Sequence, residues 1–213
     1  MSDSAPRPIK RKARVLRIVS AVYVASVGKA GEVPVGPPEF AFVGRSNCGK
    51  SSLINALCNQ NALARTSKTP GRTQAVNLFD AVLSTGQQLR LVDLPGFGHA
   101  AVSKVLLRHF AEMIQFYLLS AENLRMVVIL QDSRRDRDDD AIGFAAWLRE
   151  NKVPYEVVAT KCDEIATTKR GAICQRLMTE FRLKQLALAV SAHHKLGTDE
   201  LLVRIRNAAF AKP

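Results

Sequence analysis

The sequence lacks the features of a membrane-spanning or disulfide-linked protein. No apolar run approaches the length of about 20 residues that a membrane-spanning helix needs. The cysteines Cys48, Cys58, Cys162 and Cys174 form no C-x-x-C pair and have no zinc-ligand spacing. They indicate neither a disulfide framework nor a metal site, so reduced thiols in a cytoplasmic protein are expected.

Acidic residues are scarce relative to basic ones. Aspartate and glutamate total 19 against 31 lysines and arginines, which gives 213 residues a formal net charge of +12. One loop lysine suffices for a nucleotide, so this excess favours a polyanionic partner such as RNA. A basic solvated surface without a partner is the alternative. The 47% hydrophobic content is otherwise typical of a globular domain.

We expect an N-terminal extension at residues 1–35, followed by the main domain at residues 36–213. Residues 1–14 are polar and basic, which predicts a partly disordered arm able to contact a polyanion. The apolar stretch 15–28 is short and is interrupted by Arg17, which argues against a signal peptide. An organelle transit peptide stays open. A Gly/Pro-rich connector marks the domain boundary.

Strand and helix patterns alternate along the main domain. Apolar runs predict six strands, at 40–43, 75–79, 88–92, 126–130, 155–159 and 186–190. Helical patterns begin at 51, 102, 138, about 168 and 198. The short turn at 84–86 makes the second and third strands an antiparallel hairpin. We expect a three-layer α/β fold, with a mostly parallel six-stranded sheet, one antiparallel edge strand and helices on both faces.

The segment Gly44-Arg-Ser-Asn-Cys-Gly-Lys-Ser-Ser52 matches the phosphate-loop pattern G-x-x-x-x-G-K-[ST] without a mismatch. A predicted strand precedes it and a predicted helix follows it, as this motif requires. Glycines let backbone N–H groups curl around phosphate oxygens, and the helix adds its positive N-terminal end. Lys50 is expected to reach the β- and γ-phosphates, and the Ser51 hydroxyl to bind Mg²⁺.

Two further motifs complete the phosphate side of the expected site. Asp93-Leu-Pro-Gly96 matches D-x-x-G, in which Asp93 would bind Mg²⁺ through water and the Gly96 N–H would sense the γ-phosphate. The segment 71–74 supplies a threonine whose hydroxyl would join Mg²⁺ only while GTP is bound. Thr73 is favoured over Thr69 because it follows a Pro-Gly turn.

The segment Thr160-Lys-Cys-Asp163 indicates which nucleotide is bound. It resembles the [NT]-K-x-D base motif and follows a predicted strand. The Asp163 carboxylate can accept hydrogen bonds from N1–H and the N2 amino group of guanine, whereas adenine has neither donor. The stem of Lys161 can lie along the base. Val190-Ser-Ala192 takes the place of the last guanine motif, where a backbone N–H meets O6.

Together these blocks resemble one family. The segments 44–52, 63–74, 77–79 and 91–98 are similar to those of the EngB/YihA/YsxC family of bacterial GTPases. The resemblance implies a TRAFAC-class, Era-like GTPase that binds GTP, GDP and Mg²⁺, assists assembly of the large ribosomal subunit and serves normal cell division. Its partners would be the rRNA and ribosomal proteins of that subunit or its precursor. We expect a cytoplasmic monomer without membrane contact.

The motifs and the resemblance assign the site residues. Nucleotide contacts are expected at Gly44, Arg45, Ser46, Asn47, Cys48, Gly49, Lys50, Ser51, Ser52, Gly71, Arg72, Thr73, Gln74, Ala75, Asp93, Leu94, Pro95, Gly96, Thr160, Lys161, Cys162, Asp163, Val190, Ser191 and Ala192. Mg²⁺ is expected at Ser51 and Thr73, and at Asp93 through water. Mild departures from the family pattern are Cys48, Cys162 and the segment 97–99.

Hydrolysis is expected to be slow. Phe97 follows D-x-x-G, where many GTPases place a glutamine that orients the attacking water. In related Era-like GTPases an asparagine at the position of Asn47 resembles a ligand for K⁺, and capping of the loop is the alternative role. The candidate catalytic residues are Lys50, Asn47, Thr73 and Gly96, with stimulation by K⁺ and by a ribosomal partner.

Alternatives stay open for function and for single residues. A basic rRNA-binding protein with a mainly structural nucleotide pocket fits the charge, and an ATP-dependent kinase fits the phosphate loop but not Asp163. Cys48 is either redox-sensitive or passive. Asp138 and the two aspartates after it are expected to open a helix rather than bind metal. Trp147 is expected to pack, and the four histidines to form no metal cluster.

Overall fold

The structure is a computed structural model that describes residues 15–28, 34–64, 75–96 and 104–210, with the backbone alone for 104–111. The strands of this part are β1 (Ile18–Val27), β2 (Glu39–Gly44), β3 (Val76–Leu83), β4 (Gln88–Asp93), β5 (Leu124–Asp132), β6 (Tyr155–Thr160) and β7 (Leu188–Ala189). The helices are α1 (Lys50–Cys58), α2 (Lys104–Ser120), α3 (Asp139–Glu150), α4 (Thr167–Glu180) and α5 (Thr198–Phe210), with a 3₁₀ turn η1 (Cys162–Glu164).

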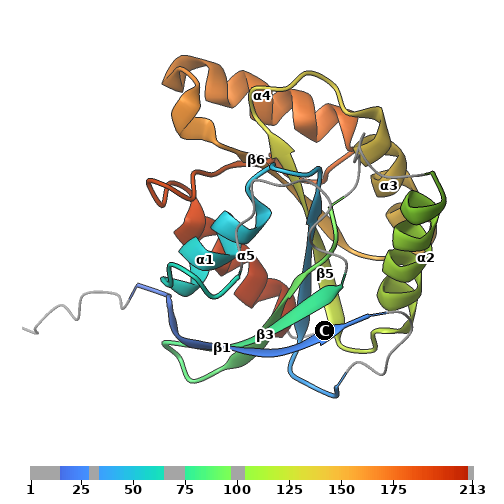
Figure 1. Cartoon of the computed structure of the whole chain (residues 1–213). Coiled ribbons are helices and arrows are strands. Elements are labelled where there is room, and N and C mark those ends of the chain that lie inside the picture. Colours follow the sequence, from blue (N-terminus) through green and yellow to red (C-terminus); the bar gives the residue numbers. More distant parts are fainter. Residues whose placement is uncertain (1–14, 29–33, 65–74, 97–103, 211–213) are drawn as a thin grey trace, which may run out of the picture.

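The strands form one sheet in the order β1-β3-β4-β2-β5-β6-β7. Every neighbouring pair from β4 to β7 along the sheet is parallel, whereas β3 runs antiparallel to both β4 and β1. The sheet stands between two groups of helices (Figure 1). The α/β class, the mostly parallel sheet and the antiparallel hairpin are confirmed.

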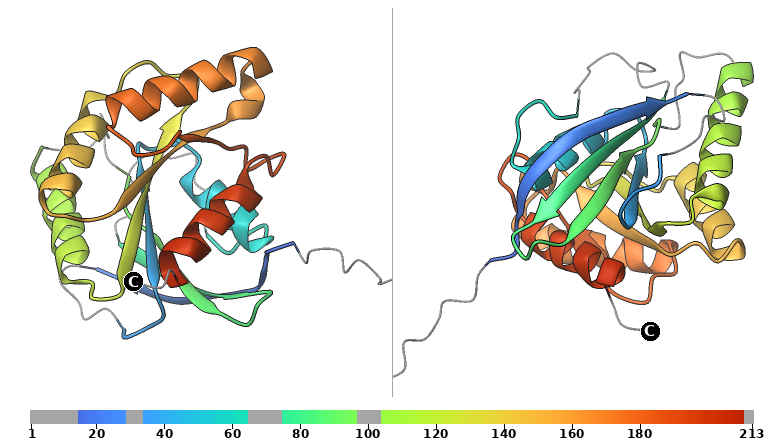
Figure 2. Two further views of the ribbon diagram at one scale, coloured as in Figure 1. Left: turned by 180° about the vertical axis from the view of Figure 1, so that it is seen from behind. Right: turned by 90° about the horizontal axis from the view of Figure 1, so that it is seen from below.

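Helices cover both faces of the sheet, and each face has its own hydrophobic core. α1 and α5 lie on one face, and α2, α3 and α4 lie on the other (Figure 2). Leu53 of α1 and Ile205 of α5 belong to the first core, and Leu148 of α3 belongs to the second. The β5 neighbours Val127 and Val128 are in different cores, because successive strand side chains point to opposite faces.

The sheet has seven strands in the described residues, so the six-stranded prediction is wrong by one. The added strand is β1, which lies at the edge, so the antiparallel strand β3 is not itself an edge strand. Only Ile18 and Ala21 of β1 are buried, and its pairing register with β3 shifts at two places. The valine- and isoleucine-rich composition of this strand favours β structure, but it lacks the regular period of two that would place it in the sheet, so the sequence predicts residues 18–27 to lie in the extension.

A buried ion cluster ties the connector before β2 to the sheet. The Arg90 side chain is 2% exposed and donates to Asp80 at 2.6 and 3.1 Å and to Glu39 at 3.2 Å. The Tyr117 hydroxyl of α2 donates to the other oxygen of Glu39 at 2.6 Å. A Cβ on Gly36 would overlap the guanidinium, so the connector passes directly over it.

The start of α3 agrees with the sequence. The Asp138 side chain caps the helix by accepting a hydrogen bond from the Ala141 N–H at 3.2 Å, and the two aspartates after it occupy the first turn. Trp147 packs against the core and stacks on Phe144, with ring centroids 6.0 Å apart. The helix-start and packing predictions are therefore confirmed.

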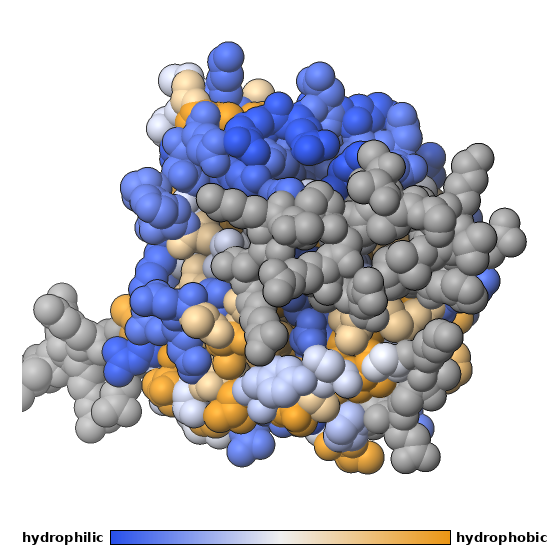
Figure 3. Space-filling view, viewed as in Figure 1, coloured by the Kyte–Doolittle hydropathy of each residue, from blue (hydrophilic) through white to orange (hydrophobic). Residues whose placement is uncertain are grey.

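The surface over α4 is hydrophilic, and apolar side chains gather at the opposite end, where β1 crosses the molecule (Figure 3). On β1, Val19 and Val22 are 55% and 56% exposed. None of the helices in the described part of the chain is both long and apolar enough to cross a bilayer.

Candidate functional site: a guanine nucleotide pocket

The sequence motifs come together at the carboxyl ends of the parallel strands. β2 ends at Gly44, β4 at Asp93 and β6 at Thr160. β2 lies between β4 and β5, so the loop after β2 stands where the strand order changes direction. Open α/β sheets bind their ligands at such a switch point.

The loop between β2 and α1 needs its glycines. Gly49, the N-cap of α1, has φ 97°, and Asn47 has φ 63°. Glycine takes this left-handed backbone without strain, and asparagine tolerates it better than most residues. A Cβ on Gly44 would come within 2.7 Å of both the Cys48 sulfur and the Leu130 carbonyl oxygen. Gly44 therefore lets the loop pack tightly on itself and against β5, and the loop leads directly into the N-terminus of α1, which can bind an anion.

Lys50, Ser51 and Asp93 meet at the base of this loop. The side chains of Lys50 and Asp93 are buried and form an ion pair. The Ser51 hydroxyl donates to the other Asp93 oxygen at 3.3 Å. The structure thus brings together the residues that the sequence assigns to the phosphates and Mg²⁺. A hydroxyl and a carboxylate are hard oxygen donors, which suit Mg²⁺.

Gly96 lies against the phosphate loop. A Cβ on Gly96 would stand 3.0 Å from the Gly44 carbonyl oxygen and 3.2 Å from the Ser46 nitrogen. The preceding turn is held to β2 by a hydrogen bond of 3.1 Å from the Leu94 N–H to the Phe42 carbonyl. A larger residue at position 96 would therefore push the D-x-x-G turn away from the loop.

The base motif is attached to the phosphate loop by two side chains. The Thr160 hydroxyl donates to the Cys48 carbonyl at 2.7 Å, and Lys161 Nζ donates to the Asn47 carbonyl at 2.7 Å. Lys161 has φ 56°, which turns its side chain back over the loop. The position of the base site relative to the phosphate site is thereby fixed.

Asp132, at the end of β5, is a site residue that the sequence argument missed. It accepts from Lys161 Nζ at 3.0 Å and from Arg134 at 2.6 and 2.8 Å. Burial acts to raise the pKa of Asp132, but the hydrogen bonds from Arg134 and Lys161 outweigh it and lower the pKa to about 2. The ionised carboxylate therefore holds Lys161 in place. Its position after a buried strand was the available signal.

A pocket lies beside the phosphate loop. Its volume is about 490 Å³, including the part that is open to solvent. Its lining residues are Gly49, Ser52, Leu53, Thr160, Lys161, Asp163, Glu164, Val190, Ala192 and His193. They come from the phosphate loop with α1, from the base motif and from the segment after β7. One cavity thus joins the expected phosphate and base sites.

The surroundings of Asp163 favour its ionised form, which accepts hydrogen bonds. A hydrogen bond from Ser191 lowers the pKa of Asp163 against the smaller effect of burial. Ser191 is fully buried. The Cys162 N–H donates to the Val190 carbonyl at 3.1 Å and joins the two base motifs. An ionised carboxylate is what recognition of guanine N1–H and N2 requires.

Cys48 is a buried thiol. Its side chain is 3% exposed, and burial raises the pKa of Cys48 to about 11 although nearby Lys50 lowers it. The thiol is therefore protonated at neutral pH, which favours the passive role over redox sensitivity. The four cysteines are all free and buried.

Part of the predicted site lies outside the described residues. This holds for Gly71, Arg72, Thr73, Gln74 and Phe97, for the competing Thr69 and for the basic arm 1–14. The roles of Thr73 in Mg²⁺ binding and of Phe97 in slow hydrolysis stay predictions. Ala75 is described and directly precedes β3.

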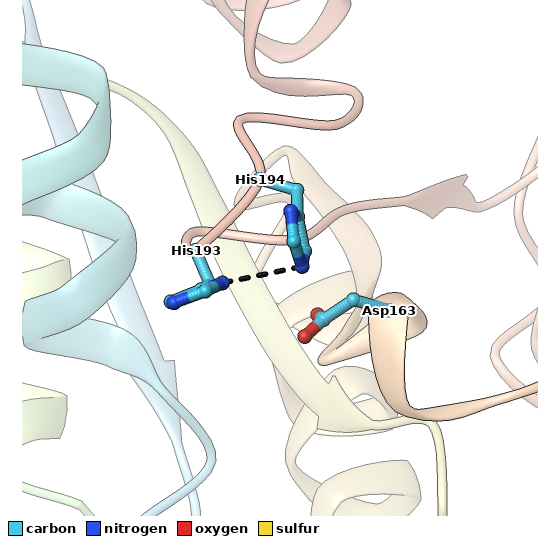
Figure 4. Close-up of side chains that lie close together, drawn as sticks. All are labelled: Asp163, His193 and His194. Atoms are coloured by element: carbon cyan, nitrogen blue, oxygen red, sulfur yellow. Dashed lines mark hydrogen bonds between the residues drawn. The ribbon is translucent and has the colours of Figure 1, made fainter.

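Two contacts at the site were not predicted. The Arg45 guanidinium of the phosphate loop lies 3.7 Å from Asp138 and 3.8 Å from Asp140, at the start of α3. His193 and His194, on the turn after β7, face the carboxylate of Asp163 in η1 (Figure 4). Both contacts join residues far apart in the sequence, which motif spacing cannot reveal.

A glycine-rich loop over a buried lysine–aspartate pair, joined to an acidic base pocket, defines a phosphate-loop GTPase. A family profile described as 50S ribosome-binding GTPase matches residues 39–161. A probable GTP-binding protein EngB of Citrifermentans bemidjiense is 41% identical over 185 residues, which cover 86% of this chain and 85% of the relative. One from Anaeromyxobacter is 40% identical over 201 residues, 91% of this chain and 93% of the relative. The chain belongs to the EngB family of GTP-binding proteins.

Solved structures agree with this assignment. A crystal structure of a probable GTP-binding protein engB superposes with a TM-score of 0.63 at 25% identity, over 80% of this chain and 98% of that one. A structure of Era with MgGDPNP and nucleotides 1506–1542 of 16S ribosomal RNA has a TM-score of 0.68 at 23% identity, over 83% and 58%. The Era likeness shows the fold alone.

Proposed function

We propose that this chain binds and slowly hydrolyses GTP as a cytoplasmic, monomeric switch in assembly of the large ribosomal subunit, and that cell division depends on it for that reason. The pocket carries the nucleotide part of the proposal, because it joins Asp163 to Gly49 of the phosphate loop, and the Lys50–Asp93 ion pair lies at the base of that loop. The 50S description of the matching family and the net charge of +12 support a ribosomal partner.

Each side chain has a distinct task in this proposal. Lys50 and the N–H groups of the loop would bind the phosphates, and Asp163 would select guanine over adenine. Mg²⁺ would be held by Ser51 and Thr73, with Asp93 acting through water. Bound there, the ion would neutralise charge on the β- and γ-phosphates.

The rate of hydrolysis is proposed to depend on the ribosome and on K⁺. Phe97 offers no polar group to orient water, so another group must stabilise the transition state. Asn47 is the proposed K⁺ ligand, while its left-handed backbone supports a structural role in the loop as the alternative. Equal turnover in K⁺ and Na⁺ would remove K⁺ from the proposal.

Co-sedimentation with purified 50S subunits tests the switch. The chain is mixed with subunits in GDP, in a non-hydrolysable GTP analogue and without nucleotide, over a range of salt, because electrostatic binding weakens steeply with salt. We expect binding that needs the triphosphate analogue and survives moderate salt. A Lys50→Ala variant keeps nearly the same surface charge and should lose the nucleotide dependence. Salt-sensitive binding indifferent to nucleotide would favour the basic rRNA-binding protein with a structural pocket.

A further inference from the structure

The segment after β7 places two imidazole rings beside the guanine acceptor. The rings of His193 and His194 meet edge to face, with centroids 4.5 Å apart and an interplanar angle of 80°. Nδ1 of His193 lies 3.2 Å from Nε2 of His194. Ligand atoms of both rings and of Asp163 lie within 4.8 Å of one another, and the carboxylate faces the rings (Figure 4).

We propose that Asp163, His193 and His194 bind a divalent transition metal such as Zn²⁺, and that this metal and guanine exclude each other from the pocket. Imidazole nitrogens and a carboxylate oxygen are the ligands that Zn²⁺ and its neighbours in the first transition row prefer. Zinc–nitrogen bonds in a tetrahedral site place two ligand nitrogens about 3.3 Å apart. The observed 3.2 Å is close to that separation.

The backbone already holds the three ligands on one side of the pocket. The Ser191 N–H donates to the Leu196 carbonyl at 2.9 Å and closes the turn that carries both histidines. The His194 N–H donates to the Ser191 hydroxyl at 3.1 Å. Because the Cys162 N–H bonds the Val190 carbonyl, η1 and this turn form one unit. The carboxylate starts no more than 4.8 Å from the two ring nitrogens.

Guanine and the metal compete for the same carboxylate. Recognition of guanine uses the Asp163 oxygens as acceptors for N1–H and N2. A cation bound to those oxygens would repel the two N–H donors. His193 also lines the pocket. Since the coupling between two ligands is reciprocal, the metal must lower GDP affinity by the factor by which GDP lowers metal affinity.

Mg²⁺ would not fill this site. It prefers oxygen ligands in an octahedral arrangement and keeps several waters, whereas two of the three ligands here are imidazoles. The pair Ser51 and Asp93 offers oxygens alone. The two kinds of metal would therefore bind at different places, with opposite effects on the nucleotide.

Calorimetric titration of Zn²⁺ into the full chain, without a polyhistidine tag and in Mg²⁺ buffer, tests the proposal. We expect one Zn²⁺ per chain, with saturating GDP lowering its affinity at least 10-fold. GDP affinity should fall by the same factor when Zn²⁺ is present. His194→Ala should lose at least 10-fold in Zn²⁺ affinity, since even outer partners of a metal site are worth about that much. It should keep GDP affinity in metal-free buffer.

His109→Ala, a substitution on α2 across the sheet, is the matched control and should bind Zn²⁺ like the unaltered chain. Equal Zn²⁺ affinity of the His194→Ala variant and the unaltered chain would overturn the site. GDP affinity unchanged by Zn²⁺ would overturn the exclusion. The metal titration needs no nucleotide, so it stands even if the proposed GTP switch fails.

Discussion

The Thr160 hydroxyl lies 2.7 Å from the Cys48 carbonyl oxygen, so one buried hydrogen bond joins the base motif to the phosphate loop. A second carbonyl, that of Gln131, lies 3.2 Å away. A hydroxyl has one hydrogen and donates to the nearer acceptor. The [NT]-K-x-D base motif of GTP-binding proteins has asparagine more often than threonine at this position, and the threonine connects the two halves of the nucleotide site.

Thr160→Val should therefore lower the free energy of unfolding by about 1–3 kcal/mol, because it keeps the shape but leaves the buried Cys48 carbonyl without its donor. Urea unfolding measures the change, and GDP affinity should fall in parallel. Thr160→Ser keeps the hydroxyl and should restore most of both. A valine variant as stable as the unaltered chain would show that the hydrogen bond contributes nothing.

Asp163→Asn should reverse the base preference. The amide presents an N–H toward the N1–H of guanine, so GTP affinity should fall by at least about 100-fold. Xanthine carries an oxygen where guanine has its N2 amino group and can accept from the new amide. Competition between GDP and xanthosine diphosphate (XDP) for binding to the variant measures its preference between guanine and xanthine. Retained preference for GDP would mean that Asp163 does not contact the base.

Local sequence predicts most of the strands and helices, but it does not predict the pairing of β1. The unbroken apolar run from Met126 to Leu130 predicts a strand with both faces covered, and all five residues are buried in β5. In β1 only Ile18 and Ala21 are buried, and the register shifts break any alternation. Its place at the edge comes from pairing with β3, a contact that no local pattern encodes.

The site residues likewise fall into two groups: those that local motifs predict and those that only contacts between distant segments reveal. The phosphate loop, the D-x-x-G turn and the base motif are short segments whose spacing alone predicts their chemistry. Asp132 was missed, as was the approach of His194 to Asp163, because these contacts arise only when segments far apart in the sequence fold together. The spacing of motifs along the sequence gives no information about such contacts.

Tyr117→Phe should lower the free energy of unfolding by about 1.5–3 kcal/mol, the usual value of a hydrogen bond to a charged group. The lost hydroxyl donates at 2.6 Å to the buried Glu39 carboxylate. Burial, together with Glu39, raises the pKa of Tyr117 far above its ordinary value, so the hydroxyl stays protonated.

Tyr155→Phe is the control for this change, because its hydroxyl donates at 2.6 Å to the neutral Phe181 carbonyl. It should cost about 1 kcal/mol. Urea unfolding of both variants gives the comparison. Equal losses would mean that the charge of Glu39 adds nothing to the Tyr117 hydrogen bond.

Asp132→Asn should reveal a pH-dependent contribution to stability. The pKa of Asp132 is lowered from 3.8 to about 2, so its ionised form is stabilised in the folded state by about 2 kcal/mol. A lowered pKa gives stability that is complete above the unfolded value and is lost as pH falls through the folded value. The advantage of the unaltered chain should therefore be constant from about pH 7 to pH 5 and should vanish between about pH 4 and pH 2.

The measurement is the difference in unfolding free energy between the two chains across that range, which cancels other carboxylates that titrate in both. Lys161 loses an ionic partner in the variant, so GDP affinity should also fall at neutral pH. A stability difference that stays constant from about pH 5 to pH 2 would mean that the pKa of Asp132 is not lowered. An unaltered chain that gains stability over the variant as pH falls would mean that burial outweighs the hydrogen bonds from Arg134 and Lys161, and Lys161 would then be held over the phosphate loop by its hydrogen bond to the Asn47 carbonyl.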